Sequence, residues 1–168
     1  MIVCETPRLR LRYLTPRDAP FILELLNEPE FIRNVGDREV RTLEDARRYI
    51  QSGTVTGYEK TGFGLYLVEL QQDATPIGVC GLLKRDYLDD VDVGFALHEG
   101  FRNQGYALEA ASAVVRYGLE VLHLGRIVAI TAPDNHASIR VLRGLGLEFE
   151  RNIRVPDLER DTSLFTPA

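Results

Sequence analysis

The sequence predicts an α+β fold in which helices pack against a mixed, mostly antiparallel β-sheet. The predicted elements follow the order strand, two helices, three strands, helix, strand, helix and two strands. Short connections join the three consecutive strands, which is typical of antiparallel hairpins. The long helix after them connects two strands as a β–α–β crossover, and such strands lie parallel. The chain shows no repeat, linker or low-complexity segment, so we expect residues 1–168 to form a single domain.

A strand and a helix are predicted in the first thirty residues. Residues 8–14 (RLRLRYL) alternate between arginine and apolar side chains, which indicates a strand with a solvated arginine face. Thr15 and Pro16 suit the cap and the first position of a helix, and Pro29 is expected to end it. The apolar face of this helix is formed by Phe21, Ile22, Leu25 and Leu26.

The next thirty residues are predicted to hold one helix between two loops. Residues 27–41 have no clear period, and Phe31 and Ile32 look exposed among charged residues. A helix starts at Thr42. Its inward-facing residues are predicted to be Leu43, Ala46, Tyr49 and Ile50. Residues 52–62 are polar and contain three glycines, so we predict a loop there.

The rest of the chain alternates between strands and two helices. The predicted strands are residues 65–70, 76–85, 91–97, 126–131, 147–155 and 162–166. A long helix begins at Gly105, and a shorter one runs from Asn135 to Gly144. The apolar face of the long helix is predicted to contain Ala107, Ala110, Ala111, Val114, Val115, Gly118, Leu119 and Leu122.

The composition is that of a soluble globular protein, with 45% hydrophobic and 27% charged residues. No apolar run reaches the length of a membrane span, and residues 1–12 lack the apolar core of a secretory signal, so we expect a cytoplasmic protein without a membrane partner. The net charge of −5 disfavours general nucleic-acid binding. Cys4 and Cys80 are far apart and have no companion histidine cluster, so we expect no disulfide framework and no metal site.

Residues 92–107 (DVGFALHEGFRNQGYA) are predicted to form an anion-binding site. A strand leads here into a short loop and then into the start of the long helix. The first N–H groups of a helix have no partner within it, and the helix dipole places partial positive charge there. Gly105 leaves room for a phosphate beside the backbone, and Arg102 adds a permanent positive charge.

The segment from Arg102 to Ala107 (RNQGYA) resembles the (Gln/Arg)-x-x-Gly-x-(Gly/Ala) signature of the GNAT superfamily of N-acetyltransferases. In that superfamily the backbone amides of this loop hold the pyrophosphate of acetyl-CoA. The element order also resembles the GNAT order, which places helices on both faces of the sheet. The resemblance implies that acetyl-CoA is bound by Arg102, Asn103, Gln104, Gly105, Tyr106 and Ala107.

A second segment carries the same resemblance. Residues 135–147 (NHASIRVLRGLGL) are similar to the N-x-x-S…L-x-x-x-G-F segment of the superfamily, and most of all to its Rim-type branch, which acetylates the N-terminal amine of ribosomal proteins. Residues 6–12 (TPRLRLR) also resemble the start of that branch. The resemblance implies that Asn135 and Ser138 face the pantetheine arm and the thioester, although Asn135 also suits a helix cap.

Acetyl transfer to an amine needs a base, donors for the oxyanion and a proton for the thiolate. In this fold the strands around the long helix are expected to splay, so that the backbone of Phe95, Ala96 and Leu97 pairs with the pantetheine arm. Gly94 suits a bulge or a close approach there. No nucleophile–base pair for an acyl-enzyme is apparent, so we expect direct attack by the amine in a ternary complex.

The catalytic residues are predicted from the resemblance and from chemistry together. The position of Glu99 resembles that of the carboxylate base proposed for Rim-type enzymes, and Asp92 and His98 remain alternatives. The tyrosine that serves many members as general acid is replaced by Leu142, so Ser138 is the predicted acid.

The acceptor is expected to meet residues 27–41 and 52–64, which do not identify it. A protein N-terminal amine, a lysine, a polyamine, an amino acid and an aminoglycoside all remain open. The resemblance and the last two strands favour a homodimer. The missing tyrosine keeps one alternative open, a non-catalytic acyl-CoA sensor or interaction module. A nucleotide-binding enzyme is disfavoured, because neither G-x-x-x-x-G-K-S/T nor G-x-G-x-x-G occurs.

Overall fold

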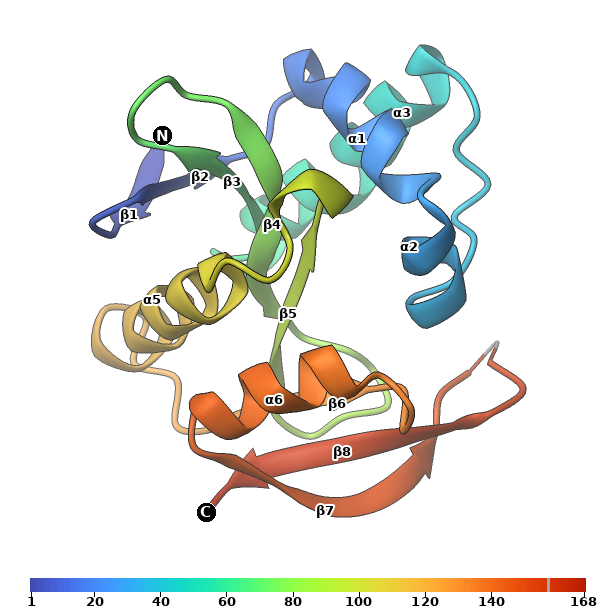
Figure 1. Cartoon of the computed structure of the whole chain (residues 1–168), viewed down its shortest axis with the longest axis vertical. Coiled ribbons are helices and arrows are strands. Elements are labelled where there is room, and N and C mark those ends of the chain that lie inside the picture. The colour runs from blue at the N-terminus through green and yellow to red at the C-terminus, as the bar shows by residue number, and fades with distance from the viewer. Residues whose placement is uncertain (157) are drawn as a thin grey trace.

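The computed structural model describes residues 1–156 and 158–168 and contains one eight-stranded sheet with the order β1-β2-β3-β4-β5-β6-β8-β7 (Figure 1). The strands are β1 (Ile2–Glu5), β2 (Leu9–Tyr13), β3 (Leu65–Leu70), β4 (Pro76–Leu83), β5 (Val91–Leu97), β6 (Ile127–Thr131), β7 (Leu147–Arg154) and β8 (Asp161–Pro167). Only β5 and β6 pair in parallel, as the crossover predicted. The predicted fold class is confirmed, and β1 is an additional edge strand that the sequence analysis did not predict.

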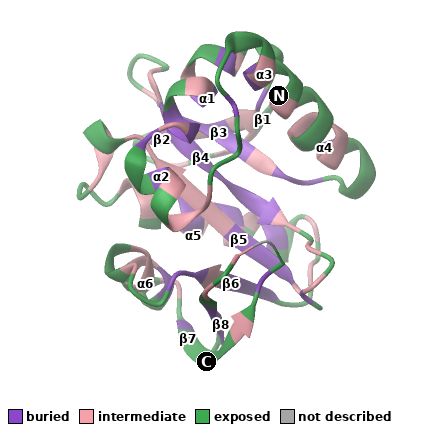
Figure 2. Cartoon of the chain, turned by 90° about the vertical axis from the view of Figure 1, so that its right-hand side faces the viewer, coloured by how far each residue is buried: buried purple, intermediate pink, exposed green. Residues whose placement is uncertain are grey.

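Helices cover both faces of this sheet (Figures 1 and 2). They are α1 (Ala19–Leu26), α2 (Pro29–Asn34), α3 (Leu43–Tyr49), α4 (Thr56–Thr61), α5 (Tyr106–Glu120) and α6 (His136–Gly144), with 3-10 turns at Pro16–Asp18 and Glu99–Phe101 and a π-helical segment at Ile50–Val55. One core cluster joins α4, α5 and α6 to one face, and a second joins α1, α2 and α3 to the other. No described helix is both long and apolar enough to cross a membrane.

The long helix α5 is held against the sheet by its small residues. Ala110, Ala111, Val114 and Gly118 are buried, as predicted. A Cβ at Gly118 would lie 2.8 Å from Ile127 Cδ1, so a larger residue here would require the end of that side chain to shift.

Two leucines predicted to face inward are exposed. Leu119 is 44% exposed because it lies about 100° around the helix from Gly118, on the solvent side. Leu43 is 41% exposed because it is the first residue of α3, before the buried stripe begins.

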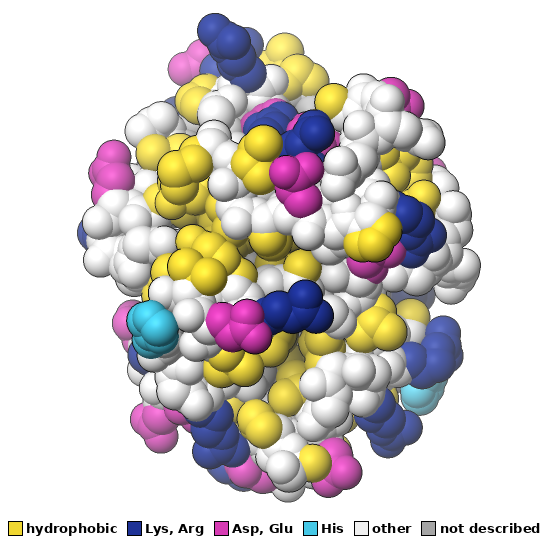
Figure 3. All heavy atoms as spheres, turned by 90° about the vertical axis from the view of Figure 1, so that its left-hand side faces the viewer, with side chains coloured by type: hydrophobic (Ala, Val, Ile, Leu, Met, Phe, Trp, Pro, Cys, Tyr) yellow, Lys and Arg dark blue, Asp and Glu magenta, His cyan; other side chains and the backbone are white. Residues whose placement is uncertain are grey.

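On the face shown in Figure 3, apolar side chains mix with charges of both signs.

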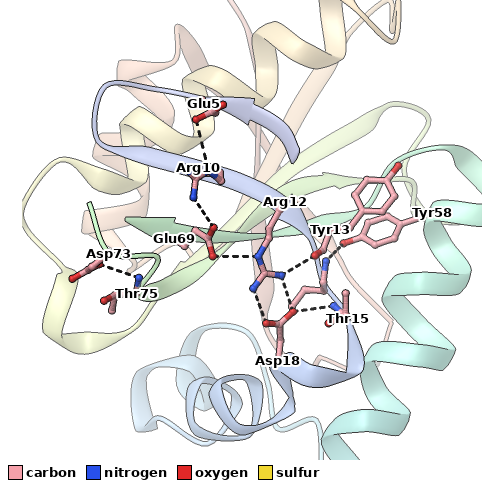
Figure 4. A network of polar contacts seen from close by, with 11 residues as sticks. Glu5, Arg10, Arg12, Tyr13, Thr15, Asp18, Tyr58, Glu69, Asp73 and Thr75 are labelled. Atoms are coloured by element: carbon pink, nitrogen blue, oxygen red, sulfur yellow. Dashed lines mark hydrogen bonds and ion pairs between the residues drawn. The ribbon is translucent and has the colours of Figure 1, made fainter. Parts of the chain in front are cut away.

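The prediction of a solvated arginine face is wrong for Arg10 and Arg12, although Arg8 is exposed. Arg10 and Arg12 both form ion pairs with Glu69, at 3.3 and 3.2 Å, and Glu69 is only 5% exposed (Figure 4). The antiparallel register sets Arg10 opposite Glu69 on β3, which brings the charges together. Arg12 also contacts Asp18, whose carboxylate accepts the N–H of Thr15 at the start of the first helical turn. The arginines therefore tie β2 to β3 and to α1.

The segment 27–41 contains the helix α2, where a loop was predicted. Pro29 is the first residue of α2, a position that suits proline because its missing N–H would have no helical partner. Phe31, predicted to be exposed, is buried among α1 and α3. A six-residue helix is too short to show a clear period in the sequence, so its apolar contact with the core decides its structure.

The segment 52–62 is also helical, where a loop was predicted. It comprises the end of the π-helical segment and α4, and Gly62 ends α4 with φ +83°. The buried Tyr58 hydroxyl accepts the N–H of Leu14 at 3.0 Å and donates to the carbonyl of Leu65. Its ring stacks on Tyr13 at 4.1 Å between centroids. These distant contacts stabilise a helix that its polar, glycine-bearing sequence does not favour.

Candidate active site

The parallel strands β5 and β6 separate soon after they meet. Their register contains only the pairs Val91↔Ile127 and Asp92↔Val128. From Val93 to Leu97, the edge of β5 that faces β6 has no strand partner among the described residues, whereas its other edge stays paired with β4. The predicted splay is thus confirmed. It leaves backbone N–H and C=O groups that an extended ligand can pair with as a strand would.

Gly94 lies in this open segment without a bulge. It pairs in regular register with Gly81, so the bulge considered in the sequence analysis is wrong. A Cβ at Gly94 would have a single neighbour within 4 Å, Leu83 Cδ1 at 3.7 Å. The glycine therefore widens the space beside β5.

The loop after β5 ends in a helix start with free donors. Gly105 precedes α5 with φ +82°, and Asn103 is also left-handed at φ +62°. No described residue accepts a hydrogen bond from the N–H groups of Tyr106, Ala107 or Leu108. Free N–H groups at the start of a fifteen-residue helix suit a diphosphate, so the loop fits the phosphates of acetyl-CoA.

Arg8, the residue before β2, is bound to this loop. Arg8 Nη1 donates to the carbonyl of Gln104 at 3.0 Å, and Nε donates to Glu109 at 2.8 Å. Its guanidinium lies 4.2 Å above the ring of Tyr106. Arg8 is exposed, as predicted, but the sequence analysis predicts no contact between Arg8 and this loop. It ties the loop and the first turn of α5 to the amino-terminal strand.

The charge predicted from Arg102 is shared with α2. Arg102 forms ion pairs with Glu28 at 3.0 Å and Glu30 at 2.9 Å. Glu28 is 7% exposed and also accepts the N–H of Glu99. These carboxylates were missed because the segment that carries them was predicted to be a loop.

A cavity of about 880 Å³ adjoins the open edge of β5. Its walls come from β4, β5 and β6, from α2 and α6, and from Val155, Pro156, Leu158 and Arg160 before β8. Among its lining residues are Asp92, Gly94, Phe95, Ala96, Asn135 and Ser138. Arg160 donates to the carbonyls of Arg33 and Asn34, at 2.8 and 3.1 Å, and so connects the β7–β8 segment to α2 across the cavity.

Comparison with protein families agrees with this geometry. Residues 8–148 match the family model described as the acetyltransferase (GNAT) domain. The chain belongs to the GNAT acetyltransferase family. The match spans β2, the loop between β5 and α5, and the whole of α6.

Individual relatives give the same assignment. The chain is 30% identical over 154 residues to the uncharacterized N-acetyltransferase YoaA of Bacillus subtilis, covering 90% of this chain and 86% of YoaA. It is 28% identical to the FsC-acetyl coenzyme A-N(2)-transacetylase of Aspergillus fumigatus, covering 85% and 63% of the two chains. The same fold occurs in the structure of RimL, a ribosomal-protein α-N-acetyltransferase, in complex with coenzyme A. The TM-score is 0.86 at 19% sequence identity, and the match covers 99% of this chain and 97% of RimL. The protein is thus a GNAT N-acetyltransferase, and this family uses acetyl-CoA.

Asp92 is the carboxylate of β5 that lines the cavity of this GNAT enzyme. It is 1% exposed and accepts a hydrogen bond from Arg85 Nε at 2.9 Å. Burial raises the pKa of Asp92, and the positive charge of Arg85 opposes this rise. A buried carboxylate with a raised pKa is a stronger base than an exposed one.

Glu99, the predicted base, lies outside the cavity lining. Its side chain is exposed, and no described residue forms an ion pair or hydrogen bond with its carboxylate. His98 is also outside the lining, and both ring nitrogens have neighbours: the N–H of Gly100 at 3.3 Å and Glu24 Oε1 at 2.8 Å. Of these three candidates for the base, Asp92 alone lines the cavity.

The start of α6 faces the cavity opposite β5. Asn135 Oδ1 accepts the N–H of Ser138 at 3.2 Å, which confirms the predicted cap. Both residues line the cavity. Leu142, one helical turn further, is 1% exposed and also lines it, so an apolar side chain stands where many members have a tyrosine. Among the described residues, no group of three metal-ligating side chains is present.

Proposed function

We propose that this GNAT enzyme acetylates a primary amine by direct attack on acetyl-CoA within a ternary complex. One observation carries the proposal: the unpaired edge of β5 lies between the free N–H groups of α5 and the cavity of about 880 Å³. A ligand whose diphosphate binds Gly105 and Tyr106 can extend along Phe95, Ala96 and Leu97 and bring its thioester to the cavity. The amine, a protein N-terminus or a small molecule, enters from the side of α2.

Three of the lining residues, Asp92, Arg85 and Ser138, then have a chemical role. Asp92 accepts the proton of the attacking ammonium, with Arg85 holding its carboxylate in place. A backbone N–H of the open β5 edge donates to the developing oxyanion. Ser138 donates a proton to the leaving sulfur, in place of the tyrosine that Leu142 replaces, and regains one from the nitrogen of the collapsing tetrahedral intermediate. Glu99 remains the second candidate for the base, and it would accept the proton through a water molecule.

A thiol-release assay with acetyl-CoA tests this function. The panel contains an N-terminal peptide, lysine, spermidine, an amino acid and an aminoglycoside. We expect thiol release with at least one amine, in equal amount to the acetylated amine found by mass spectrometry. Binding of acetyl-CoA without thiol release for any amine would instead support the non-catalytic sensor, which the leucine at position 142 keeps as the second candidate.

Direct attack is tested separately from turnover. Intact-mass spectrometry of the enzyme after incubation with acetyl-CoA alone should show no acetylated protein. Initial rates at varied concentrations of both substrates should give intersecting lines in a double-reciprocal plot. A stable acetyl-enzyme with parallel lines would show a covalent mechanism instead.

A further inference from the structure

We propose that the acceptor is a small molecule in which a carboxylate or phosphate group accompanies the primary amine. This inference rests on the proposed function and narrows its acceptor. It comes from the charges that line the cavity. Arg38, Lys84, Arg85 and Arg160 all line it.

Three of these cations lack a carboxylate partner among the described residues. Lys84 donates to the carbonyls of Arg85 and Leu88, which carry no net charge. Arg160 donates only to the two carbonyls of α2 described above. Arg38 is exposed and forms no ion pair within residues 1–156 and 158–168. Their positive charges are therefore available to a ligand.

The carboxylates in the described lining do not balance them. Asp92 is paired with Arg85, and Asp37 is paired with Arg41, which lies outside the lining. Asp86 alone faces the three cations without a partner in the described chain. The whole protein carries a net charge of −5, and the surface in Figure 3 mixes both signs. The surplus of positive charge is thus a local property of the cavity.

This surplus has two consequences for an amine. Nearby cations disfavour the ammonium form, so they lower the pKa of a bound amine and favour the neutral nucleophile. They also repel acceptors that carry several positive charges, such as polyamines and aminoglycosides. An anionic group on the acceptor reverses the repulsion, because it can form charge-assisted hydrogen bonds with Lys84 or the guanidinium groups. The cavity therefore fits an amine that brings its own negative charge.

The size of the cavity and the contact of Arg160 favour a small molecule over a peptide. Arg160 lines the cavity and links the β7–β8 segment to the end of α2. A volume of about 880 Å³ lies in the range of small-molecule sites, and here it must also receive the thioester end of acetyl-CoA. The chain of a peptide acceptor would have to pass this link.

Matched amine pairs in the thiol-release assay test the inference. L-threonine is compared with L-threoninamide, and O-phosphoethanolamine with ethanolamine; spermidine and a short acidic peptide complete the set. The amide has the less basic amine, so intrinsic reactivity at neutral pH favours it over the acid. We expect at least one anionic member to exceed its neutral partner about tenfold or more in kcat/KM, which equals about 1.4 kcal/mol.

Variants locate the effect in the cavity. Lys84→Glu and Arg38→Glu should remove most of the kcat/KM preference for the anionic member. Lys84→Gln, which removes the charge without reversing it, should also reduce this preference. Lys60→Glu, an exposed lysine on α4 outside the lining, is the control and should keep the preference. The KM for acetyl-CoA should stay near wild type in all of them.

The outcomes separate this inference from the proposed function. Equal or better turnover of the neutral amines or spermidine, or a preference that survives Lys84→Glu and Lys84→Gln, would overturn the anionic acceptor while leaving the acetyltransferase intact. Higher kcat/KM for the acidic peptide would overturn the small-molecule part. If acetyl-CoA bound but no amine released thiol, the proposed function would fail, and this inference with it.

Discussion

Replacement of Gly105 by valine should weaken acetyl-CoA binding about 10- to 100-fold. Gly105 has φ +82°, a conformation that costs a non-glycine residue about 1–2 kcal/mol. A Cβ at this position would also lie 3.3 Å from Nη2 of Arg8, whose Nη1 donates to the loop carbonyl of Gln104. Relief of this strain turns the loop N–H groups away from the phosphates. The loss of one charge-assisted hydrogen bond, about 1.5–3 kcal/mol, corresponds to the expected change in Kd.

A matched glycine separates this effect from lower stability. Gly62 has φ +83° at the end of α4, and a Cβ there would meet nothing within 4 Å. Gly62→Val should therefore carry a similar backbone strain and lower the melting temperature by a few degrees, at about 2–4 °C per kcal/mol for a chain of this length. Isothermal titration calorimetry with acetyl-CoA should show weaker binding for Gly105→Val only. Equal affinities in the two folded variants would refute the phosphate-loop interpretation.

Four other predictions concern catalysis, cofactor binding and assembly. Asp92→Asn should lower kcat about 100-fold or more, and by more than Glu99→Gln does. Burial raises the pKa of Asp92 and catalysis requires its carboxylate form, so as the pH decreases, wild-type activity should begin to fall at a higher pH than with an ordinary aspartate. A larger loss of kcat in Glu99→Gln than in Asp92→Asn would return the role of the base to Glu99. Glu109→Gln removes the partner of Arg8 and should raise the Kd for acetyl-CoA severalfold with little change in kcat; calorimetry showing an unchanged Kd would contradict this. Treatment with EDTA should leave thiol release intact, and recovery by added zinc after a loss would show a metal requirement. Light scattering should find a homodimer, with β7 as the edge strand that pairs, and a monomer at high protein concentration would exclude it.

Seven of the eight strands and the loop before α5 could be predicted because their signals are local. Alternating apolar residues predicted β5, and the parallel pairing with β6 followed from the crossover. Asn135 could be predicted to cap α6 because a cap depends on residues within one turn. These features follow from a few neighbouring residues, so the sequence alone defines them.

Features that depend on distant contacts could not be predicted. The helix α4 is stabilised by Tyr58, whose hydroxyl contacts Leu14, 44 residues away. Arg8 contacts Glu109 across 101 residues, and Arg102 contacts Glu28 across 74. No local pattern shows which charges the fold will bring together. The sequence therefore placed Arg8 on a solvated face, and it could not show that Asp92, and not Glu99, lines the cavity.

A crystal structure of the protein with acetyl-CoA would test most directly whether the open edge of β5 presents the thioester to the cavity. We expect the diphosphate to accept hydrogen bonds from the N–H groups at Gly105 and Tyr106. The pantetheine arm should pair with the backbone between Phe95 and Leu97, with the acetyl group between Asp92 and Ser138. Binding of acetyl-CoA at another surface, or with its acetyl group away from the cavity lined by Asp92 and Ser138, would contradict this account of the active site.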